Sequence, residues 1–423
     1  MLVKDLQTFI VGNPPPHKGG RYFIFVKLTT DDGITGIGEV YNATFAPSVI
    51  KHMIDDVIRH HVENTDPFKI ETLWRNVYGR GYSLRPDISL MGVLSGLETA
   101  LWDIIGKATG RPVYDLLGGC VHEKIRTYTY LYPPDNIDAN SAHPVYSDAD
   151  AAANRAVDYV EQGFTAVKFD PAGPYTTFDP HQPDLESIKR SEAFVKTIRA
   201  AVGSKADLLF GTHGQFTTSG AIRLAAVLES SDPLWFEEPV PPERPEEMAR
   251  VARQTTIPIA TGERLTTKYE FARLLELQAA SILQPALGRV GGILEAKKIA
   301  AMAEASYAQI APHLYCGPIE GAANIQLAAC SPNLLILESI ENWDGFHNEL
   351  LTKPIEWQDG YIIPSREPGL GVLSSMKRSL ITIPTQVTNC ISNPGNHPSD
   401  ARQRYTSMVY LSTTYSSMRI RYR

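Results

Sequence analysis

The sequence lacks the features that mark a disulfide-stabilised or membrane-spanning protein. Its cysteines follow no metal-binding or redox spacing; they are Cys120, Cys316, Cys330 and Cys390. Such cysteines fit a reducing compartment better than a disulfide framework. No apolar run reaches about 18 residues, so we expect no spanning helix. The first residues resemble a strand rather than a secretion signal, and these absences together predict a soluble, cytoplasmic protein.

An excess of positive charge is also absent. The 423 residues carry a formal net charge of −7, and the charged residues are scattered rather than grouped in blocks. This balance predicts neither a nucleic-acid nor a membrane partner. With 43% hydrophobic residues, the chain is long enough for a barrel of roughly 250 residues and a smaller domain.

The first part of the chain has the pattern of a small sheet followed by helices. Residues 22–30 alternate as a strand, Asp31-Asp32-Gly33 is a hairpin-turn signal, and a second strand follows it. The proline- and glycine-rich stretch 13–20 is expected to be a loop. Helices are predicted at 46–61, 70–78 and 91–109. This order predicts a small α+β domain.

From about Arg126 the pattern changes to repeated strands and helices. Each predicted helix precedes a short apolar strand; the helices are 148–161, 185–202, 219–228, 246–254, 268–277, 292–305 and 321–330. Alternating βα units predict a parallel closed sheet. Polar residues fall just after the strand ends, on the face where such barrels place their chemistry.

Two of these polar residues are glutamates 26 residues apart. Glu237 and Glu263 each close a short apolar run, and one strand-loop-helix unit has about that length. Successive strands would therefore carry both acids to one mouth of the barrel. Carboxylates that converge without a basic partner repel each other, and a divalent cation is the usual remedy. The spacing predicts a barrel enzyme with a hard metal ion.

Several motifs carry a resemblance to a known family. The run from Ser95 to Gly119, with Glu237-Glu-Pro, Gly262-Glu263 and Ala311-Pro-His313, resembles the mandelate racemase subgroup of the enolase superfamily. Within that subgroup, Thr212-His-Gly and Gln284-Pro are most similar to the sugar-acid dehydratases of the galactonate dehydratase kind. The resemblance extends from residue 1 to about residue 372.

The resemblance implies a modified (β/α)7β TIM barrel with an α+β capping domain. We expect residues 1–122 to form the N-terminal part of the cap, residues 123–340 the catalytic barrel, and residues 341–372 a segment that returns to the cap. Residues 373–423 are rich in Ser, Thr, Tyr and Arg, with Asp400 as their only acid. They are predicted to be a disordered tail, or a segment foreign to the ancestral domain. By analogy with the family, the protein is expected to be a homo-oligomer.

The resemblance also implies a reaction. A base removes the proton α to the carboxylate of a sugar acid, an aldonate or an aldarate, and a metal ion stabilises the enediolate. A general acid then expels the β-hydroxyl as water, which gives a 2-keto-3-deoxy acid. The metal implied is Mg²⁺, with Mn²⁺ or another divalent ion as the alternative.

The metal ligands implied by the resemblance are incomplete in this chain. Glu237 and Glu263 fall on ligand positions, but the third position is Gly211, where the family has Asp. His213 lies two residues later, so in an extended segment it faces the same side. It is predicted either to be the general acid, or to replace the missing ligand with a preference for softer ions, or to be structural.

The catalytic base shows a similar departure. His313 falls on the position of the family's base, but the Asp that would orient it is replaced by Ala286. Loss of that carboxylate should weaken the imidazole as a base. Lys168 is a candidate second base or a clamp on the substrate carboxylate. Asp170 stands where relatives often carry a second lysine, and it could supply an acid near the metal.

The candidate substrate-binding residues lie at strand ends and in loops of the cap; they are Asp170, Arg264, Glu338, His17 and Arg85. Arg264 is as well suited to a structural ion pair. The motifs also leave two other functions open. One is a racemase, epimerase or lactone cycloisomerase of the same superfamily, which the presence of both Lys168 and His313 permits. The other is a catalytically impaired barrel, suggested by Gly211 and Ala286.

Overall fold

The computed structural model describes residues 1–41, 45–82, 87–176 and 180–372. The chain begins with an antiparallel sheet in the order β1 (Val3–Gly12), β2 (Tyr22–Thr30) and β3 (Thr35–Glu39). Gly33, at φ +87°, forms the turn of the predicted hairpin, a conformation that glycine adopts without strain. The predicted tail and Arg85 lie outside the described residues.

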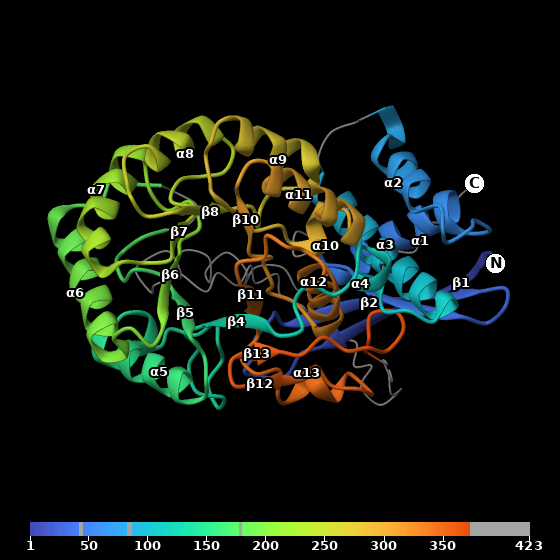
Figure 1. The fold of residues 1–423 in the computed structure, drawn as a ribbon, viewed down its shortest axis with the longest axis horizontal. Helices are drawn as coiled ribbons and strands as arrows, with labels where there is room; N and C mark the ends of the chain where they lie inside the picture. Colours follow the sequence, from blue (N-terminus) through green and yellow to red (C-terminus); the bar gives the residue numbers. More distant parts are fainter. Residues whose placement is uncertain (42–44, 83–86, 177–179, 373–423) are drawn as a thin grey trace, which may run out of the picture.

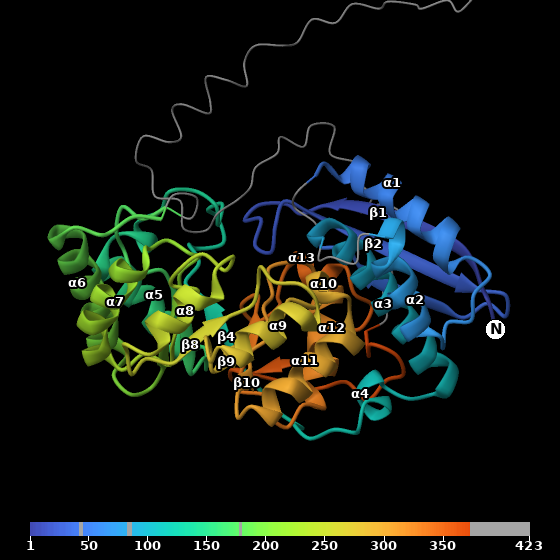
Figure 2. The same cartoon turned by 90° about the horizontal axis from the view of Figure 1, so that it is seen from above.

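Helices pack on one face of this sheet and share a core with it. They are α1 (Pro47–Val57), η1 (Ile58–Val62), α2 (Ile70–Tyr78) and α3 (Ile88–Thr109). The turn η2 (Arg80–Tyr82) follows α2, and α4 (Val113–Leu116) places Val113 and Tyr114 in the core that includes the barrel. Figure 2 shows the sheet and helices α1 to α3 together on one side of the molecule. The sequence located the three longer helices within a few residues, which is the usual uncertainty of helix ends.

Helix α3 is the one helix among the described residues that is long and apolar enough to cross a membrane by length and composition alone, whereas no spanning helix was expected. However, 83% of its apolar window is buried inside the protein. The side chain of Asp87 accepts hydrogen bonds from Ser89 and Leu90 and caps its first turn. The apolar composition of α3 is therefore accounted for by its central place in the core.

The rest of the chain forms a modified (β/α)7β barrel, as expected. Parallel strands neighbour one another in the order β10-β9-β8-β7-β6-β5-β4, and β11 pairs with β4. A parallel bridge between Ile310 and Leu334 joins the two ends of this series. Figure 1 shows the helices following one another around the strands. The strands are β4 (Ile125–Tyr130), β5 (Ala166–Phe169), β6 (Asp207–Gly211), β7 (Trp235–Glu237), β8 (Ile259–Thr261), β9 (Ile282–Leu283), β10 (Gln309–Ile310) and β11 (Leu337–Ser339).

The helices of the barrel match the sequence prediction closely. They are α5 (Ala149–Glu161), α6 (Leu185–Val202), α7 (Thr218–Leu228), α8 (Pro245–Ala252), α9 (Thr267–Glu276), α11 (Ile293–Ala305) and α12 (Pro318–Ala329), with the short α10 (Leu287–Val290) before α11 and the 3₁₀ turns η3 (Pro144–Tyr146) and η4 (Glu229–Ser231). Strands β9 and β10 are shorter than the apolar runs suggested. Helix α10 and both 3₁₀ turns were not predicted.

Residues 341–372 contact both the barrel and the cap. Strand β13 (Tyr361–Ile362) pairs antiparallel with β4 and with β12 (Trp357–Gln358), and α13 (Phe346–Glu349) precedes them. Further along, the Leu370 amide donates to Oδ1 of Asp103 on α3 at 3.0 Å. These contacts agree with a segment that returns to the cap, while the domain boundaries themselves stay a prediction.

Candidate active site

A small apolar layer inside the barrel determines where the polar site lies. Its buried members come from successive strands and include Ala166, Leu209, Trp235, Ile282, Ala311 and Ile336. Side chains two residues apart on a strand point to the same face. The residues two positions after each of these are Lys168, Gly211, Glu237, Gln284, His313 and Glu338. The barrel therefore brings most of the predicted site residues together just above this layer.

Glu237 is fully buried, and each of its oxygens has a partner. Oε1 accepts a hydrogen bond from Nζ of Lys168 at 2.7 Å. Oε2 accepts from Nε2 of Gln284 at 2.8 Å and from Nε1 of Trp235 at 3.2 Å. In the sequence Gln284 stands out only as part of a motif. Its position two residues after Ile282, on the same face of the strand, is the signal for a role at this carboxylate.

Lys168 lies between two carboxylates. Its Nζ is 2.7 Å from Oε1 of Glu237 and 3.4 Å from Oε1 of Glu338. Burial would lower the pKa of Lys168, but Glu237 and Glu338 outweigh it and hold the pKa well above its ordinary value. The ammonium form is therefore stabilised, which opposes the predicted role of Lys168 as a second base.

His313 has carboxylates beside it despite the loss of the expected Asp. Its Nδ1 lies 3.0 Å from Oε2 of Glu338 and 3.2 Å from Oε2 of Glu263. Ala286 bridges to His313 through the backbone only. Burial alone would lower the pKa of His313, but Glu263 and Glu338 outweigh it and raise the pKa. The expected weakening of this imidazole was wrong, because Glu338 of β11 and Glu263 after β8 supply the negative charge.

His213 lies near two acids without close contact to either. Its Nδ1 is 3.9 Å from Oδ1 of Asp170, and its Nε2 is 3.9 Å from Oε1 of Glu263. Burial lowers the pKa of His213 to about 4. Asp170 accepts a hydrogen bond from the Tyr130 hydroxyl at 3.1 Å, and burial raises its pKa to about 7. At neutral pH His213 is therefore the uncharged imidazole.

Arg264 takes part in a structural ion pair. Its Nε donates to Oε1 of the buried Glu238 at 2.6 Å, and its Nη2 donates to the carbonyl of His213 at 3.0 Å. The guanidinium thus supports the backbone that carries His213. Its predicted contact with substrate stays a prediction, and it would have to be made alongside the pair with Glu238.

His17 lies in the loop between β1 and β2, as expected from the cap. Its Nδ1 is 2.6 Å from the carbonyl of Asn13, and its Nε2 is 3.9 Å from Oδ2 of Asp138. Because Asp138 follows β4, this loop of the cap contacts the barrel. The role of His17 in substrate binding stays a prediction.

Two site residues were missed by the sequence analysis. Arg289 of α10 donates from Nη1 to the carbonyl of Glu263 at 2.8 Å, and its guanidinium lies 4.3 Å from the centre of the Tyr41 ring. Tyr41 in turn stacks at 6.4 Å on His313. Arg289 lies in the glycine-containing run 288–292, which the sequence motifs did not mark as part of the site. Tyr41 follows β3, so the cap contributes directly to the surroundings of His313.

The residues at the mouth do not form the expected metal site. A hard divalent ion takes oxygen ligands, typically from several carboxylates. The third ligand position is Gly211, and the Glu237 carboxylate is engaged by Lys168. Oε2 of Glu263, Oδ1 of Asp170 and Nδ1 of His213 are buried without a hydrogen-bond partner. Even so, no three His, Cys, Asp or Glu side chains among the described residues are grouped closely enough to hold one metal ion. The predicted ligand set of Glu237, Glu263 and His213 is therefore not assembled.

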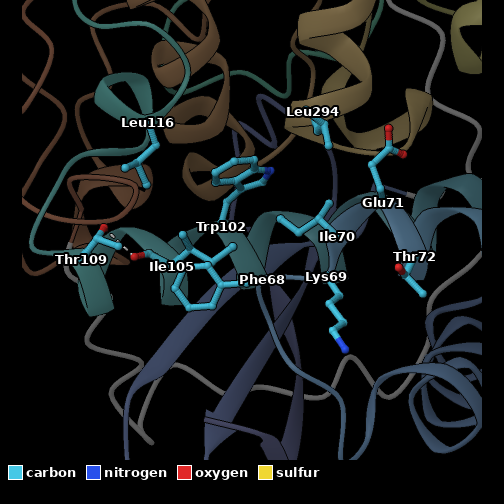
Figure 3. A pocket seen from close by; sticks show the side chains of 10 residues that line it. All are labelled: Phe68, Lys69, Ile70, Glu71, Thr72, Trp102, Ile105, Thr109, Leu116 and Leu294. Carbon is cyan, nitrogen blue, oxygen red and sulfur yellow. Dashed lines mark hydrogen bonds between the residues drawn. The ribbon is translucent and has the colours of Figure 1, made fainter.

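A separate pocket lies away from this mouth. It is formed by α2, α3, α4 and α11 with the residues just before α2, and Figure 3 shows Trp102, Ile70 and Leu294 among its lining side chains. None of the candidate site residues contributes to it. The chemistry predicted from the sequence therefore belongs to the barrel mouth.

Comparison with known proteins identifies the family. Residues 17–118 match the mandelate racemase/muconate lactonizing enzyme N-terminal domain, and residues 151–377 match the enolase C-terminal domain-like family. The chain therefore belongs to the mandelate racemase/muconate lactonizing enzyme group of the enolase superfamily, as the motifs indicated.

Individual relatives make the likeness more specific. The chain is 33% identical over 378 residues to the D-gluconate/D-galactonate dehydratase of Picrophilus torridus. The matched region covers 89% of this chain and 92% of that protein. It is 34% identical to the D-xylonate dehydratase of Haloferax volcanii, over 88% of this chain and 86% of that protein. A solved structure from Labrenzia alexandrii DFL-11, described as of the mandelate racemase/muconate lactonizing enzyme type, is 66% identical with a TM-score of 0.85, over 88% of this chain and 93% of that one.

Proposed function

We propose that this protein is a hydro-lyase that dehydrates a sugar acid, an aldonate or an aldarate, to a 2-keto-3-deoxy acid. The observation that carries the proposal is the position of His313, with Nδ1 close to both Glu338 and Glu263 at the barrel mouth. The names of the relatives, which are gluconate, galactonate and xylonate dehydratases, support a lyase and this class of substrate.

His313 is the proposed base. Carboxylates beside Nδ1 favour the tautomer with the proton on that atom, which leaves Nε2 as the acceptor. Nε2 takes the proton from the carbon α to the substrate carboxylate, and the electron pair of that C–H bond moves into the enediolate. The raised pKa of His313 makes it a stronger base than a free imidazole.

Loss of the β-hydroxyl requires a proton donor, and His313 is also the proposed donor. His213, which the sequence favoured as the acid, has a pKa lowered to about 4 and carries no spare proton at neutral pH. The imidazolium formed on His313 holds the abstracted proton and delivers it to the departing hydroxyl as the Cβ–O bond breaks. The products are water and an enol, which tautomerises to the 2-keto-3-deoxy acid.

The remaining polar residues are proposed to bind substrate. Lys168 is an ammonium and so acts as a clamp on the substrate carboxylate rather than as a base. Arg289 presents a further cation next to Glu263, while Asp170 and Glu338 offer acceptors to hydroxyl groups. His17 and Arg264 lie at the periphery of this set and are assigned to the distal end of the substrate.

Membership of this family generally implies a divalent metal, and Mg²⁺ or Mn²⁺ is the ion predicted from the sequence. Such an ion would neutralise the developing enediolate charge. Glu237 would have to exchange Lys168 for the ion in order to ligate it, so no step of this proposal passes through a metal.

A racemase or epimerase is less well supported. Inversion at the α-carbon generally uses bases on both faces of the substrate, and the second candidate is Lys168. Its ammonium is stabilised by Glu237 and Glu338, so it is a poor acceptor at neutral pH.

The test is a screen of aldonates and aldarates for 2-keto-acid formation, run with EDTA, with Mg²⁺ and with Mn²⁺. We expect turnover of at least one acid, and loss of that turnover in His313→Asn. Inversion of an α-carbon without release of a 2-keto acid would refute the dehydratase and favour the racemase. Turnover that is unchanged in His313→Asn would refute the assigned base.

A further inference from the structure

We propose that Lys168 is the resident cation of the barrel mouth, and that Gly211 is present because it makes room for that lysine. On this view the chain does not bind a divalent ion tightly at Glu237 and Glu263. The inference concerns the charge of the site and does not rest on the proposed function.

The path of the Lys168 side chain across the barrel strands supports this proposal. Lys168 lies on β5 and pairs in register with Leu209 of β6, while Gly211 of β6 pairs with Glu237 of β7. To reach Glu237, the side chain of Lys168 must therefore cross β6, and it does so over Gly211. A β-carbon added at Gly211 would lie 2.6 Å from Cε and 3.0 Å from Cγ of Lys168.

These distances make the glycine and the lysine interdependent. A carbon at 2.6 Å is well inside van der Waals contact, so one of the two groups would have to move. Lys168 is only 2% exposed, and its ammonium is held by Glu237 at 2.7 Å. A larger residue at position 211 would force the Lys168 side chain off this path. Gly211 thus leaves the space that the Lys168 side chain occupies, and a fixed positive charge lies next to Glu237.

The charges around Lys168 also support its role as the resident cation. Glu237, Glu263 and Glu338 are buried carboxylates that would repel one another without a counter-charge. Lys168 contacts the first and the third, and His313 lies between the second and the third. Arg289 adds a cation beside Glu263. Cationic side chains therefore already supply the compensation that a divalent ion would otherwise provide.

Metal binding without substrate tests this inference separately from the dehydratase activity. The full chain, stripped with EDTA, is titrated with Mn²⁺ and free ion is followed by electron paramagnetic resonance. We expect no saturable site in the wild type below about 1 mM, a weak affinity for an oxygen-ligand site. A stoichiometric site in the micromolar range that is lost in Glu237→Gln or Glu263→Gln would overturn the proposal.

Two variants test the roles of Gly211 and Lys168. Gly211→Asp adds the third carboxylate and displaces Lys168, whereas Lys168→Ala frees Glu237 without adding bulk at position 211. We expect each to bind Mn²⁺ at least about tenfold more tightly than the wild type, because a carboxylate becomes available to the ion. Lys196→Ala, which removes an exposed lysine paired with Glu192, is the matched control and should leave Mn²⁺ binding unchanged.

If Gly211→Asp fails to fold, Lys168→Ala still decides the question. Mn²⁺ affinity equal to wild type in folded Lys168→Ala would show that the lysine does not occupy a metal position, and the proposal would be wrong. Circular dichroism on each variant establishes that it is folded. Because no substrate is present, either result leaves the dehydratase proposal to its own test.

Discussion

Oε2 of Glu338 lies 3.0 Å from Nδ1 of His313 and also accepts a hydrogen bond from the Leu314 amide at 2.7 Å. One oxygen therefore contacts the imidazole and the backbone directly after it. Glu338 lies in the last strand of the barrel, β11, and His313 follows the strand before it, β10. The imidazole is therefore contacted from β11, whereas the resemblance led us to expect an Asp at position 286, after β9.

Glu338→Gln should alter the pH dependence of turnover. His313 acts as a base only when it is deprotonated, so kcat/KM should rise with pH through its pKa. Glu338 helps to raise the pKa of His313. Removing the charge of Glu338 should therefore lower the pKa of His313 and move the rising limb of the pH profile to lower pH. The maximal rate should fall by about 10- to 100-fold, because a weaker and less well oriented base remains. The pH profile of kcat/KM measures both effects, and an unmoved limb with a reduced rate would contradict them.

His213→Asn should separate the two proton transfers. If His313 performs both, this variant keeps exchange of the α-proton with D2O and keeps some dehydration, with a rate loss below about 100-fold. His313→Asn should lose both reactions. Mass spectrometry of recovered substrate measures exchange, and 2-keto-acid formation measures dehydration. Exchange that persists while dehydration is abolished in His213→Asn would instead restore His213 as the general acid.

The architecture could be predicted from the sequence because it depends on repetition. Alternating apolar strands and amphipathic helices recur at a regular interval, and the motif around Glu237-Glu238-Pro239 marks where the strands end. Local periodicity was less informative for β12 and β13, which are two residues each and depend on pairing with β4 far away in sequence. Boundaries of such short strands are decided by tertiary contacts rather than by propensity.

The site could be predicted only as a set of residues. Strand-end positions located Lys168, Glu237, His313 and Glu338 correctly as neighbours, because they share one face of the barrel. The hydrogen-bond and ion-pair partners of each side chain could not be predicted from the strand-end positions. The absence of Asp at Ala286 indicated a weakened base, whereas the fold brings Glu263 and Glu338 to the same imidazole.

Arg264→Met should destabilise the protein, because Glu238 is fully buried and would lose its ion-pair partner. Breaking one side of such a pair leaves a buried charge without compensation. We expect a loss of about 2–4 kcal/mol in the free energy of unfolding, close to the lower end for buried pairs because Arg264 is partly exposed. The measurement is urea denaturation followed by circular dichroism.

The matched control for that loss is Arg273→Met, in which the arginine pairs with the exposed Glu246 on the molecular surface. A solvent-exposed pair of this kind should change stability by no more than about 0.5 kcal/mol. Double replacement with Glu238→Gln should recover part of the loss seen in Arg264→Met, since the buried charge itself is then removed. Equal losses for Arg264→Met and Arg273→Met would mean that the pair with Glu238 contributes little, and Arg264 would then be free to serve the substrate as the sequence suggested.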